Sequence, residues 1–248
     1  MQNRRIFITG VTAGLGRSLV QEFLAHGYEV WGIGRSAMDD AVPAGGKFVY
    51  TTADVTRAED VDRIMRAMNA SHFIPDIVLL NAGVALDDVE ASFRFPAFKK
   101  SVETNLFGAI TWIESFLPAF LERGGTFAAV SSLSAYRAMN RHKIGYPCSK
   151  AALNMAFEGM RIQYGGKGVR FVTFCPGPMR SEGNSLFAIS YQAAAKRIFL
   201  HLHQRRRANV VRFPLVPSLL YRVSSLIPDR VLARLLADLP AKSGGSKT

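Results

Sequence analysis

Short apolar runs alternate along the chain with longer stretches in which apolar residues recur every three to four positions. This alternation is typical of β-strands joined by helices that cover both faces of a parallel sheet. The runs Phe127–Val130 and Val169–Phe174 are apolar at consecutive positions, which indicates strands buried on both faces. We therefore expect an α/β fold with three layers, a doubly wound parallel sheet between two layers of helices.

The alternation predicts individual elements. Strands are expected at Arg5–Thr9, Glu29–Gly34, Lys47–Thr52, Ile77–Asn81, Thr126–Ser131, Arg170–Cys175 and Asn209–Arg212. Helices are expected at Leu15–His26, Ala58–Ala70, Phe98–Leu121, Gly145–Tyr164 and Tyr191–His203. Gly27 follows the first helix, where a left-handed residue is favoured, and Thr56 with Glu59 has the spacing of a capping box before the second.

No repeat or Ser/Pro-rich linker interrupts this pattern, so we predict one domain over residues 1–212. Residues 213–240 continue as an extension, in which Pro228 is expected to open a short helix. That helix has an apolar stripe, which must be buried on the chain's own loops, on a second subunit or in a membrane surface. The stripe consists of Val231, Leu232, Leu235 and Leu236. Residues 241–248, rich in Ser, Gly and Lys, are predicted to be disordered.

Composition narrows the class of protein. The chain has 248 residues, of which 48% are hydrophobic and 20% charged, so it can bury a large core and is not a disordered protein. Its two cysteines, Cys148 and Cys175, lie in apolar stretches, which fits a reducing compartment and no disulfide framework. The apolar segment near the N-terminus is too short for a signal peptide, and no run is long enough to span a membrane. We expect a cytoplasmic protein.

The basic charge is concentrated at one end. The net charge is +12, but residues 191–248 hold eleven Lys and Arg against two acidic residues, which leaves the remainder nearly neutral. Arg205–Arg207 is the strongest basic run and has no aromatic residues or recognition helix beside it, so no nucleic-acid partner is expected. A solvated turn, a membrane surface or an oligomer contact would each account for it. No metal site is expected, because His201 and His203 point in different directions on a helix.

Three glycines follow the first predicted strand and open the first helix, with the spacing G-x-x-x-G-x-G. Glycine lets the backbone turn sharply and approach a pyrophosphate, while the start of the helix offers unpaired N–H groups. This turn predicts a dinucleotide site. Its candidate residues are Gly10, Thr12, Gly14, Leu15 and Gly16.

The second predicted strand ends at Arg35 and Ser36. Proteins that bind NAD usually have an acidic residue here, which accepts a hydrogen bond from the ribose 2′-hydroxyl. A cation and a hydroxyl suit a 2′-phosphate instead, so NADP(H) is favoured over NAD(H). A solvated arginine at a strand end is the alternative.

Tyr146 and Lys150 begin a predicted helix four residues apart, and this spacing places the phenol and the ammonium on one face. The pKa of a tyrosine is near 10, too high for efficient proton transfer at neutral pH. We expect the Lys150 charge to lower it. Cys148, between the two, is predicted to be a core residue.

Two further segments are needed to compare the chain with known families, besides the glycine turn and the Y-x-x-x-K spacing. Asn81-Ala82-Gly83 follows the fourth strand and Pro176-Gly177-Pro178-Met179-Arg180-Ser181 follows the sixth. Over about residues 4–211 the chain resembles the short-chain dehydrogenase/reductase family. The resemblance implies a Rossmann-type sheet and hydride transfer between a nicotinamide and an alcohol or carbonyl.

The resemblance also implies roles for single residues. Asp54 and Val55 would contact the adenine, and Asn105 would help to hold a water for proton relay. The segment after the fourth strand would support the sheet beside the cofactor, through Asn81, Ala82 and Gly83. The segment after the sixth strand would receive the nicotinamide carboxamide, through Pro176, Gly177, Met179 and Ser181, with Met and Ser where the family has Val and Thr.

In the reaction so implied, Tyr146 exchanges the proton, and Lys150 binds the nicotinamide ribose. The serine that orients the reacting oxygen is assigned to Ser132, with Ser134 as the alternative. Ser132 lies fourteen residues before Tyr146, one more than the commonest spacing in the family, and Ser134 lies twelve before it. A protein that only senses NADP(H) or serves as a scaffold is the alternative to an enzyme.

The substrate loop is expected at Ser181–Ala194, facing Leu133, Tyr136 and Met139. These residues are mostly apolar, which favours a hydrophobic alcohol or carbonyl as the small-molecule substrate. The family's usual Gly- and Asp-containing end is missing and the 213–240 extension stands in its place. We expect a homodimer or homotetramer, with a peripheral membrane contact through the extension as a further option.

Overall fold

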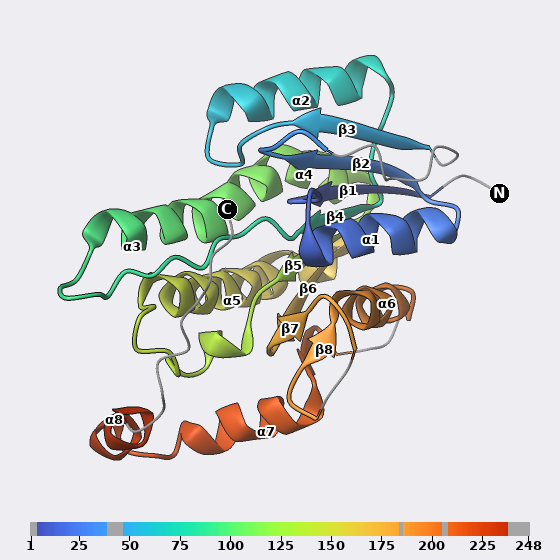
Figure 1. Cartoon of the computed structure of the whole chain (residues 1–248). Helices are drawn as coiled ribbons and strands as arrows, with labels where there is room; N and C mark the ends of the chain where they lie inside the picture. Colours follow the sequence, from blue (N-terminus) through green and yellow to red (C-terminus); the bar gives the residue numbers. More distant parts are fainter. Residues whose placement is uncertain (1–3, 39–46, 184–185, 205–207, 238–248) are drawn as a thin grey trace.

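A computed structural model describes residues 4–38, 47–183, 186–204 and 208–237. Its main sheet has seven parallel strands in the order β3-β2-β1-β4-β5-β6-β9 (Figure 1). The strands are β1 (Arg5–Thr9), β2 (Glu29–Gly34), β3 (Phe48–Thr52), β4 (Ile77–Leu80), β5 (Gly125–Val130), β6 (Val169–Pro176) and β9 (Val210–Phe213). Because strand order runs outward in both directions from β1 and β4, the predicted doubly wound α/β fold is confirmed.

Helices cover both faces of this sheet. The core on one face includes residues of α1 and α6, and the core on the other face includes residues of α2, α4 and α5. The helices of the main body are α1 (Gly14–Ala25), α2 (Ala58–Ala70), α3 (Phe95–Val102), α4 (Gly108–Arg123), α5 (Gly145–Tyr164) and α6 (Tyr191–Leu202). Short 3₁₀ turns, η2 (Leu133–Ala135) and η3 (Gly165–Lys167), and a small ladder of β7 (Met179–Arg180) with β8 (Ile189–Ser190), complete this body.

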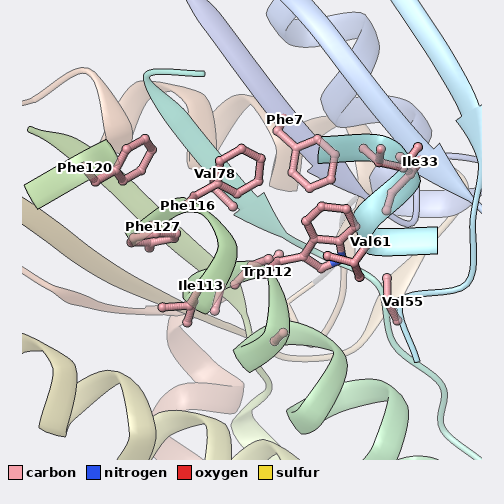
Figure 2. Packing of buried hydrophobic residues seen from close by; sticks show 14 of the residues in the cluster. Phe7, Ile33, Val55, Val61, Val78, Trp112, Ile113, Phe116, Phe120 and Phe127 are labelled. Atoms are coloured by element: carbon pink, nitrogen blue, oxygen red, sulfur yellow. The ribbon is translucent and has the colours of Figure 1, made fainter. Parts of the chain in front are cut away.

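Aromatic side chains fill the core between the sheet and α4 (Figure 2). The Phe7 and Trp112 ring centroids are 4.6 Å apart, and those of Phe120 and Phe127 are 4.7 Å apart. All four side chains are fully buried, and each such burial stabilises the fold by roughly 2–3 kcal/mol. The periodic apolar pattern of α4 is thus explained by its packing on β1 and β5.

Two local expectations need correction. The predicted helix Phe98–Leu121 is α3, a π-helical segment η1 (Glu103–Phe107) and α4, so it begins at Phe95 and is interrupted at its middle. The predicted capping box is wrong, because Thr56 donates its hydroxyl to Asp54 Oδ1 at 2.7 Å and α2 has no side-chain cap. Gly27 does adopt the expected left-handed conformation, with φ of +77°.

The extension forms two helices, α7 (Leu215–Ser224) and α8 (Asp229–Ala237), and the second begins directly after Pro228, as predicted. Of the predicted apolar stripe of α8, Leu232 is buried, but Val231 and Leu235 are 47% and 54% exposed. The chain's own residues therefore cover only part of this stripe. The predicted disordered tail and Arg205–Arg207 lie outside the described residues. Within the described ranges, no helix has the length and apolar character needed to cross a bilayer.

Candidate active site

The glycine turn between β1 and α1 is packed too closely for side chains. A Cβ on Gly16 would lie 1.8 Å from the Gly10 carbonyl oxygen, and one on Gly10 would lie 2.7 Å from Ala82 Cα. Gly10 also has a φ of +71°, which side chains rarely tolerate. No side chain makes a capping hydrogen bond at Ala13, where α1 begins. The first N–H groups of α1 are therefore available to bind an anion.

A cavity of about 480 Å³ opens beside this turn, at the carboxyl ends of the strands. Most of the predicted cofactor residues line it: Gly10, Thr12, Gly14, Leu15, Gly16, Arg35, Ser36, Val55, Asn81, Ala82, Gly83 and Met179. Strands from both halves of the sheet supply them, and the switch point between such halves is where ligands bind in this architecture. The cavity thus brings together twelve of the predicted cofactor residues, while the other six and the catalytic candidates Asn105 and Ser132 do not line it. The six are Asp54, Tyr146, Lys150, Pro176, Gly177 and Ser181.

Asp54 lies in an adjoining depression, which it shares with Arg35. Burial acts to raise the pKa of Asp54, but hydrogen bonds from the Thr56 N–H and hydroxyl outweigh it and hold the pKa below its usual value. The Asp54 N–H in turn donates to Asp60 Oδ2 at 2.9 Å. These bonds hold the loop after β3 in one conformation.

The end of β2 is braced from β3. The Tyr50 hydroxyl donates to the Gly34 carbonyl at 3.0 Å and also to the Ser36 carbonyl. Arg35, between these two residues, is exposed and lines both the main cavity and the adjoining depression. Its guanidinium is therefore placed to meet an anion that lies between them.

Tyr146 and Ser132 lie near each other, outside the residues that line the cavity. The Ser132 hydroxyl is near enough to the Tyr146 phenol to lower the pKa of that phenol, and it accepts a hydrogen bond from the Ser134 N–H at 3.1 Å. Ser134 contributes its backbone to holding Ser132 rather than its hydroxyl to Tyr146. The geometry thus favours Ser132 over Ser134 as the partner of the phenol.

Lys150 is buried on the next turn of α5. Cys148, between Tyr146 and Lys150, is exposed, so the prediction that it is a core residue is wrong. The Lys150 Nζ donates to the Val130 carbonyl at 2.7 Å and lies 5.9 Å from the centroid of the Tyr146 ring. Burial lowers the pKa of Lys150 to about 8, since the charged form loses its hydration.

The expected lowering of the Tyr146 pKa by Lys150 is not found. Burial raises the pKa of Tyr146, and the neighbouring Ser132 hydroxyl only partly opposes this. Lys150 does not lower it, because with a pKa of about 8 its amine has already lost its proton in the pH range where Tyr146 titrates.

Asn105 belongs to the π-helical segment η1, a type of irregularity that often marks functional sites. Its Nδ2 donates to the Val84 carbonyl and to Ser149 Oγ, both at 2.9 Å, and its Oδ1 accepts from the Val84 N–H at 2.7 Å. A Cβ on Gly83 would lie 3.1 Å from Asn105 Oδ1 and 3.3 Å from Lys150 Nζ. Gly83 therefore leaves open the space between these two polar groups.

The residues of the segment after β6 do not all lie at the cavity. Met179 lines the cavity, whereas Pro176 ends β6 and Gly177 lies among Leu133, Pro214 and Pro217. Ser181 follows β7 and is exposed, outside the residues that line the cavity. Of the carboxamide-binding set, only Met179 is thus brought to the cavity itself.

Six residues that line the cavity were not among the predicted site residues: Ala13, Gly34, Ala53, Val84, Thr104 and Tyr191. The Thr104 hydroxyl is buried and has no hydrogen-bond partner in the described part of the chain. The Tyr191 ring lies 3.4 Å from where a Cβ on Gly14 would be, at the start of α6. The position of Thr104, next to Asn105, was a usable signal, but nothing local to Tyr191 indicated it.

The residues present suit a dinucleotide. The close-packed glycines provide a cradle that any Cβ would fill, beside a cavity that Thr104 also lines. Groups of three or more His, Cys, Asp or Glu residues arranged to hold a metal are absent from the described ranges.

A model of the short chain dehydrogenase family matches residues 4–188, which is most of the chain. The chain belongs to this family. An uncharacterized oxidoreductase of Myxococcus xanthus is 32% identical over 189 residues, with 73% of this chain and 74% of that protein covered. A serine 3-dehydrogenase of Rhizobium radiobacter is 31% identical over 181 residues, with 71% and 72% covered.

Solved structures of this family have the same fold. A short-chain dehydrogenase from Streptomyces avermitilis gives a TM-score of 0.80 at 22% identity, with 95% of this chain and 96% of that one covered. One from Burkholderia cenocepacia in complex with NADP gives 0.77 at 24% identity, with 94% and 98% covered. The family assignment, the Rossmann-type fold and the enzyme class are thereby confirmed. The short-chain dehydrogenase is an oxidoreductase that interconverts CH–OH and C=O groups of small molecules with NAD(P)(H).

A substitution at Lys150 is expected to stabilise the protein. A pKa near 8 in place of 10.5 corresponds to about 3 kcal/mol against the charged form in the fold. Without added nucleotide at pH 7, Lys150→Met is therefore expected to raise the free energy of unfolding by about 1–3 kcal/mol, measured by urea denaturation.

The pH dependence follows from proton binding. Between pH 8 and 10.5 the unfolded state holds a proton on Lys150 that the folded state has lost, so stability of the unaltered protein rises with pH across this window. The gain from Lys150→Met should shrink there. Lys167→Met removes a charge beside the ring of Tyr164 and serves as the control, with a change below about 0.5 kcal/mol. A gain that does not vary with pH would show that the Lys150 pKa is normal.

Proposed function

We propose that this short-chain dehydrogenase transfers hydride between NADP(H) and the carbonyl or secondary alcohol of an apolar substrate. The nearness of the Ser132 hydroxyl to the Tyr146 phenol, with Lys150 buried on the next turn of α5, carries this proposal. Such a pair can hold one oxygen atom and exchange its proton, which is what carbonyl reduction requires. The bound nicotinamide supplies the hydride.

Within this proposal, the chain's own residues hold the dinucleotide along the cavity. The glycine turn and the start of α1 bind the pyrophosphate, with the Thr104 hydroxyl and Tyr191 as further contacts. Asp54 and Val55 contact the adenine, and Asn81–Gly83 supports the sheet beside the cofactor. Lys150 binds the nicotinamide ribose, while Pro176, Gly177, Met179 and Ser181 receive the carboxamide.

In the reduction direction, Ser132 donates a hydrogen bond to the substrate oxygen and orients it. Tyr146 then gives its phenolic proton to that oxygen as the carbon is reduced. The raised pKa of Tyr146 keeps the phenol protonated until negative charge develops on the oxygen. Lys150, with its pKa near 8, and Asn105 connect the phenol to a proton path from solvent.

Arg35 and Ser36 support NADP(H) as the preferred cofactor. They end β2 at the cavity, with no acidic side chain of β2 at this end to accept from a ribose hydroxyl. Solved relatives include both an NADP complex from Burkholderia cenocepacia and an NAD⁺ complex from Leptospira borgpetersenii. Family membership alone therefore leaves both cofactors open, and the preference rests on these two residues.

The apolar substrate is supported by the loop before α6. Leu186 and Phe187 are 64% and 55% exposed beside β8, where a bound hydrophobic group would cover them. To test the proposal, NADPH oxidation is followed with 2-butanone, 2-octanone, acetophenone and a charged ketone such as pyruvate. Turnover that rises from 2-butanone to 2-octanone supports it. Turnover of pyruvate alone would refute an apolar substrate, and tight NADPH binding without turnover of any carbonyl would favour the non-catalytic alternative.

We further propose a cytoplasmic homodimer or homotetramer. Met155 and Ile162 on α5 are 67% and 81% exposed, and a depression of about 390 Å³ between α4 and α5 is lined mostly by apolar side chains. A second copy of the chain would cover such side chains, because solvent contact of large apolar groups is unfavourable. Light scattering on purified protein distinguishes this from a monomer.

A second surface supports a peripheral membrane contact. The outer face of α7 and the turn after it expose five apolar residues, and α7 has no acidic side chain. Arg222 on α7 and Arg230 and Arg234 on α8 add positive charge to the extension. This pairing of apolar and cationic groups suits an anionic bilayer. The five apolar residues are Leu215, Leu219, Leu220, Val223 and Leu226.

We expect the protein to co-sediment with vesicles containing phosphatidylglycerol, and less with phosphatidylcholine alone, because the arginines add attraction to anionic lipid. Leu219→Glu combined with Leu220→Glu should reduce the bound fraction several-fold, while Met155→Glu on α5 should not. Equal binding of all variants to both vesicle types would refute the contact.

A further inference from the structure

The first residues of the 213–240 extension contact the segment after β6 and the turn η2. The Gly177 N–H donates to the Phe213 carbonyl at 2.7 Å, and the Phe213 side chain is fully buried. A Cβ on Gly177 would lie 3.1 Å from Leu133 Cδ1 and 3.2 Å from Pro217 Cβ. The first turn of α7 thus packs onto the turn η2, directly after Ser132.

The extension is fastened again where α7 passes into α8. The Arg137 guanidinium donates to the Ile227 carbonyl at 2.7 Å and pairs with Asp229 Oδ1 at 2.9 Å. Arg137 lies in the loop that leads from Ser132 to Tyr146. Helix α7 is therefore held at both ends against the loop that carries the reacting groups, as its position below β7, β8 and α5 in Figure 1 also shows.

The inner face of α7 consists of Pro217, Ser218, Tyr221 and Ser224. Ser218 Oγ donates to the Pro214 carbonyl at 2.6 Å and Ser224 Oγ to the Tyr221 carbonyl at 2.9 Å, so both hydroxyls serve their own helix. Tyr221 is the one large side chain of this face, and it is partly exposed. It is thus left available to a ligand.

Tyr221 belongs to the face of α7 that turns toward the loop between Ser132 and Tyr146, since Pro217 on the same face packs on Gly177 beside Leu133. Burial is the main cause of the raised pKa of Tyr146, and Tyr221 adds a smaller contribution in the same direction. Neither Leu219 nor Leu220 shares this position, because they lie on the outer face and are 59% and 51% exposed.

We infer that α7 is a wall of the substrate site and that Tyr221 contacts the substrate, with its ring packed against the apolar group next to the carbonyl. This rests on the proposed function and specifies where the apolar part of the substrate lies. An aryl or alkyl group bound there is covered by Tyr221 on one side while Ser132 and Tyr146 hold its oxygen. Substrate contact is then made by a segment outside the part that the family model matches.

The kinetic test uses 2-octanone and acetophenone with the full chain. Tyr221→Ala should raise KM about tenfold with kcat and NADPH affinity within about threefold, since the ring's packing is lost and the proton-transfer groups stay. Tyr221→Phe keeps the ring and should leave KM within about twofold. Leu220→Ala, one residue away on the outer face, is the matched control and should behave as the unaltered protein. An unchanged KM for Tyr221→Ala would overturn the inference.

A second test needs no substrate. In a Cys148→Ser background, which removes the exposed native thiol, Tyr221→Cys and Leu220→Cys are each labelled with dithiobis-nitrobenzoate. Saturating NADP⁺ should slow labelling at position 221 at least fivefold and leave position 220 unchanged. Equal rates at position 221 with and without NADP⁺ would refute its place beside the reacting groups. Protection without turnover of any carbonyl would instead refute the proposed function and leave the position of Tyr221 established.

Discussion

Tyr146→Phe is expected to lower the rate of carbonyl reduction by about 10²–10⁴-fold while NADPH affinity stays within about twofold. The phenol is the proton donor in the proposed mechanism, and its raised pKa keeps it protonated at neutral pH. The ring itself packs as before in phenylalanine, so the fold and the cavity are retained. NADPH fluorescence gives the affinity, and the oxidation of NADPH with 2-octanone gives the rate.

Tyr164→Phe is the matched control, because Tyr164 ends the same helix, α5, away from the cavity. It loses one hydroxyl from a ring that packs on Phe171, and it should retain full turnover. If Tyr146→Phe reduced carbonyls as fast as the unaltered protein, Tyr146 would not be the proton donor. If it failed to bind NADPH, the loss of turnover would report on the cofactor site instead.

Arg35→Asp is expected to reverse the cofactor preference. It replaces a cation that would pair with the 2′-phosphate by an anion that repels it and can accept from a ribose hydroxyl. A charged hydrogen bond contributes about 1.5–3 kcal/mol, so NADPH affinity should fall by about 10²-fold. NADH affinity should rise, although by less, because Ser36 and the rest of the loop are unchanged.

The measurement is a pair of fluorescence titrations with NADPH and NADH. Arg66→Asp, at an exposed position of α2, makes the same change in net charge and should leave both affinities within about twofold. A preference for NADH in the unaltered protein would contradict the proposed role of Arg35. Equal losses in Arg35→Asp and Arg66→Asp would indicate a general charge effect.

Local pattern was sufficient for most elements of the fold. Strands such as β5 and β6 are apolar at consecutive positions because both of their faces are buried, and this is visible without any partner. The end of α1 was equally clear, since Gly27 is needed for a left-handed residue there. Expectations failed where tertiary contacts compete with local signals, as at Thr56, whose hydroxyl bonds to Asp54 instead of capping α2.

Burial is the property that the site residues did not reveal by themselves. The Tyr146–Lys150 spacing predicted a shared helix face, but the pKa of Tyr146 is raised because desolvation outweighs the attraction of a lysine whose own pKa falls to about 8. The choice of Ser132 over Ser134 depended on which hydroxyl meets the phenol. Neither result can be read from spacing, because both depend on what surrounds the groups in three dimensions.

By itself, the sequence determined the α/β fold, the glycine cradle before α1, the Arg35–Ser36 end of β2 and the Tyr146–Lys150 pair, because each depends on residues adjacent along the chain. Only the tertiary structure decided that Thr104 and Tyr191 line the cavity and that α7 packs against Leu133 and Gly177. Those contacts join segments far apart in the sequence. They arise from packing of the whole sheet and its extension, for which no local pattern carries a signal.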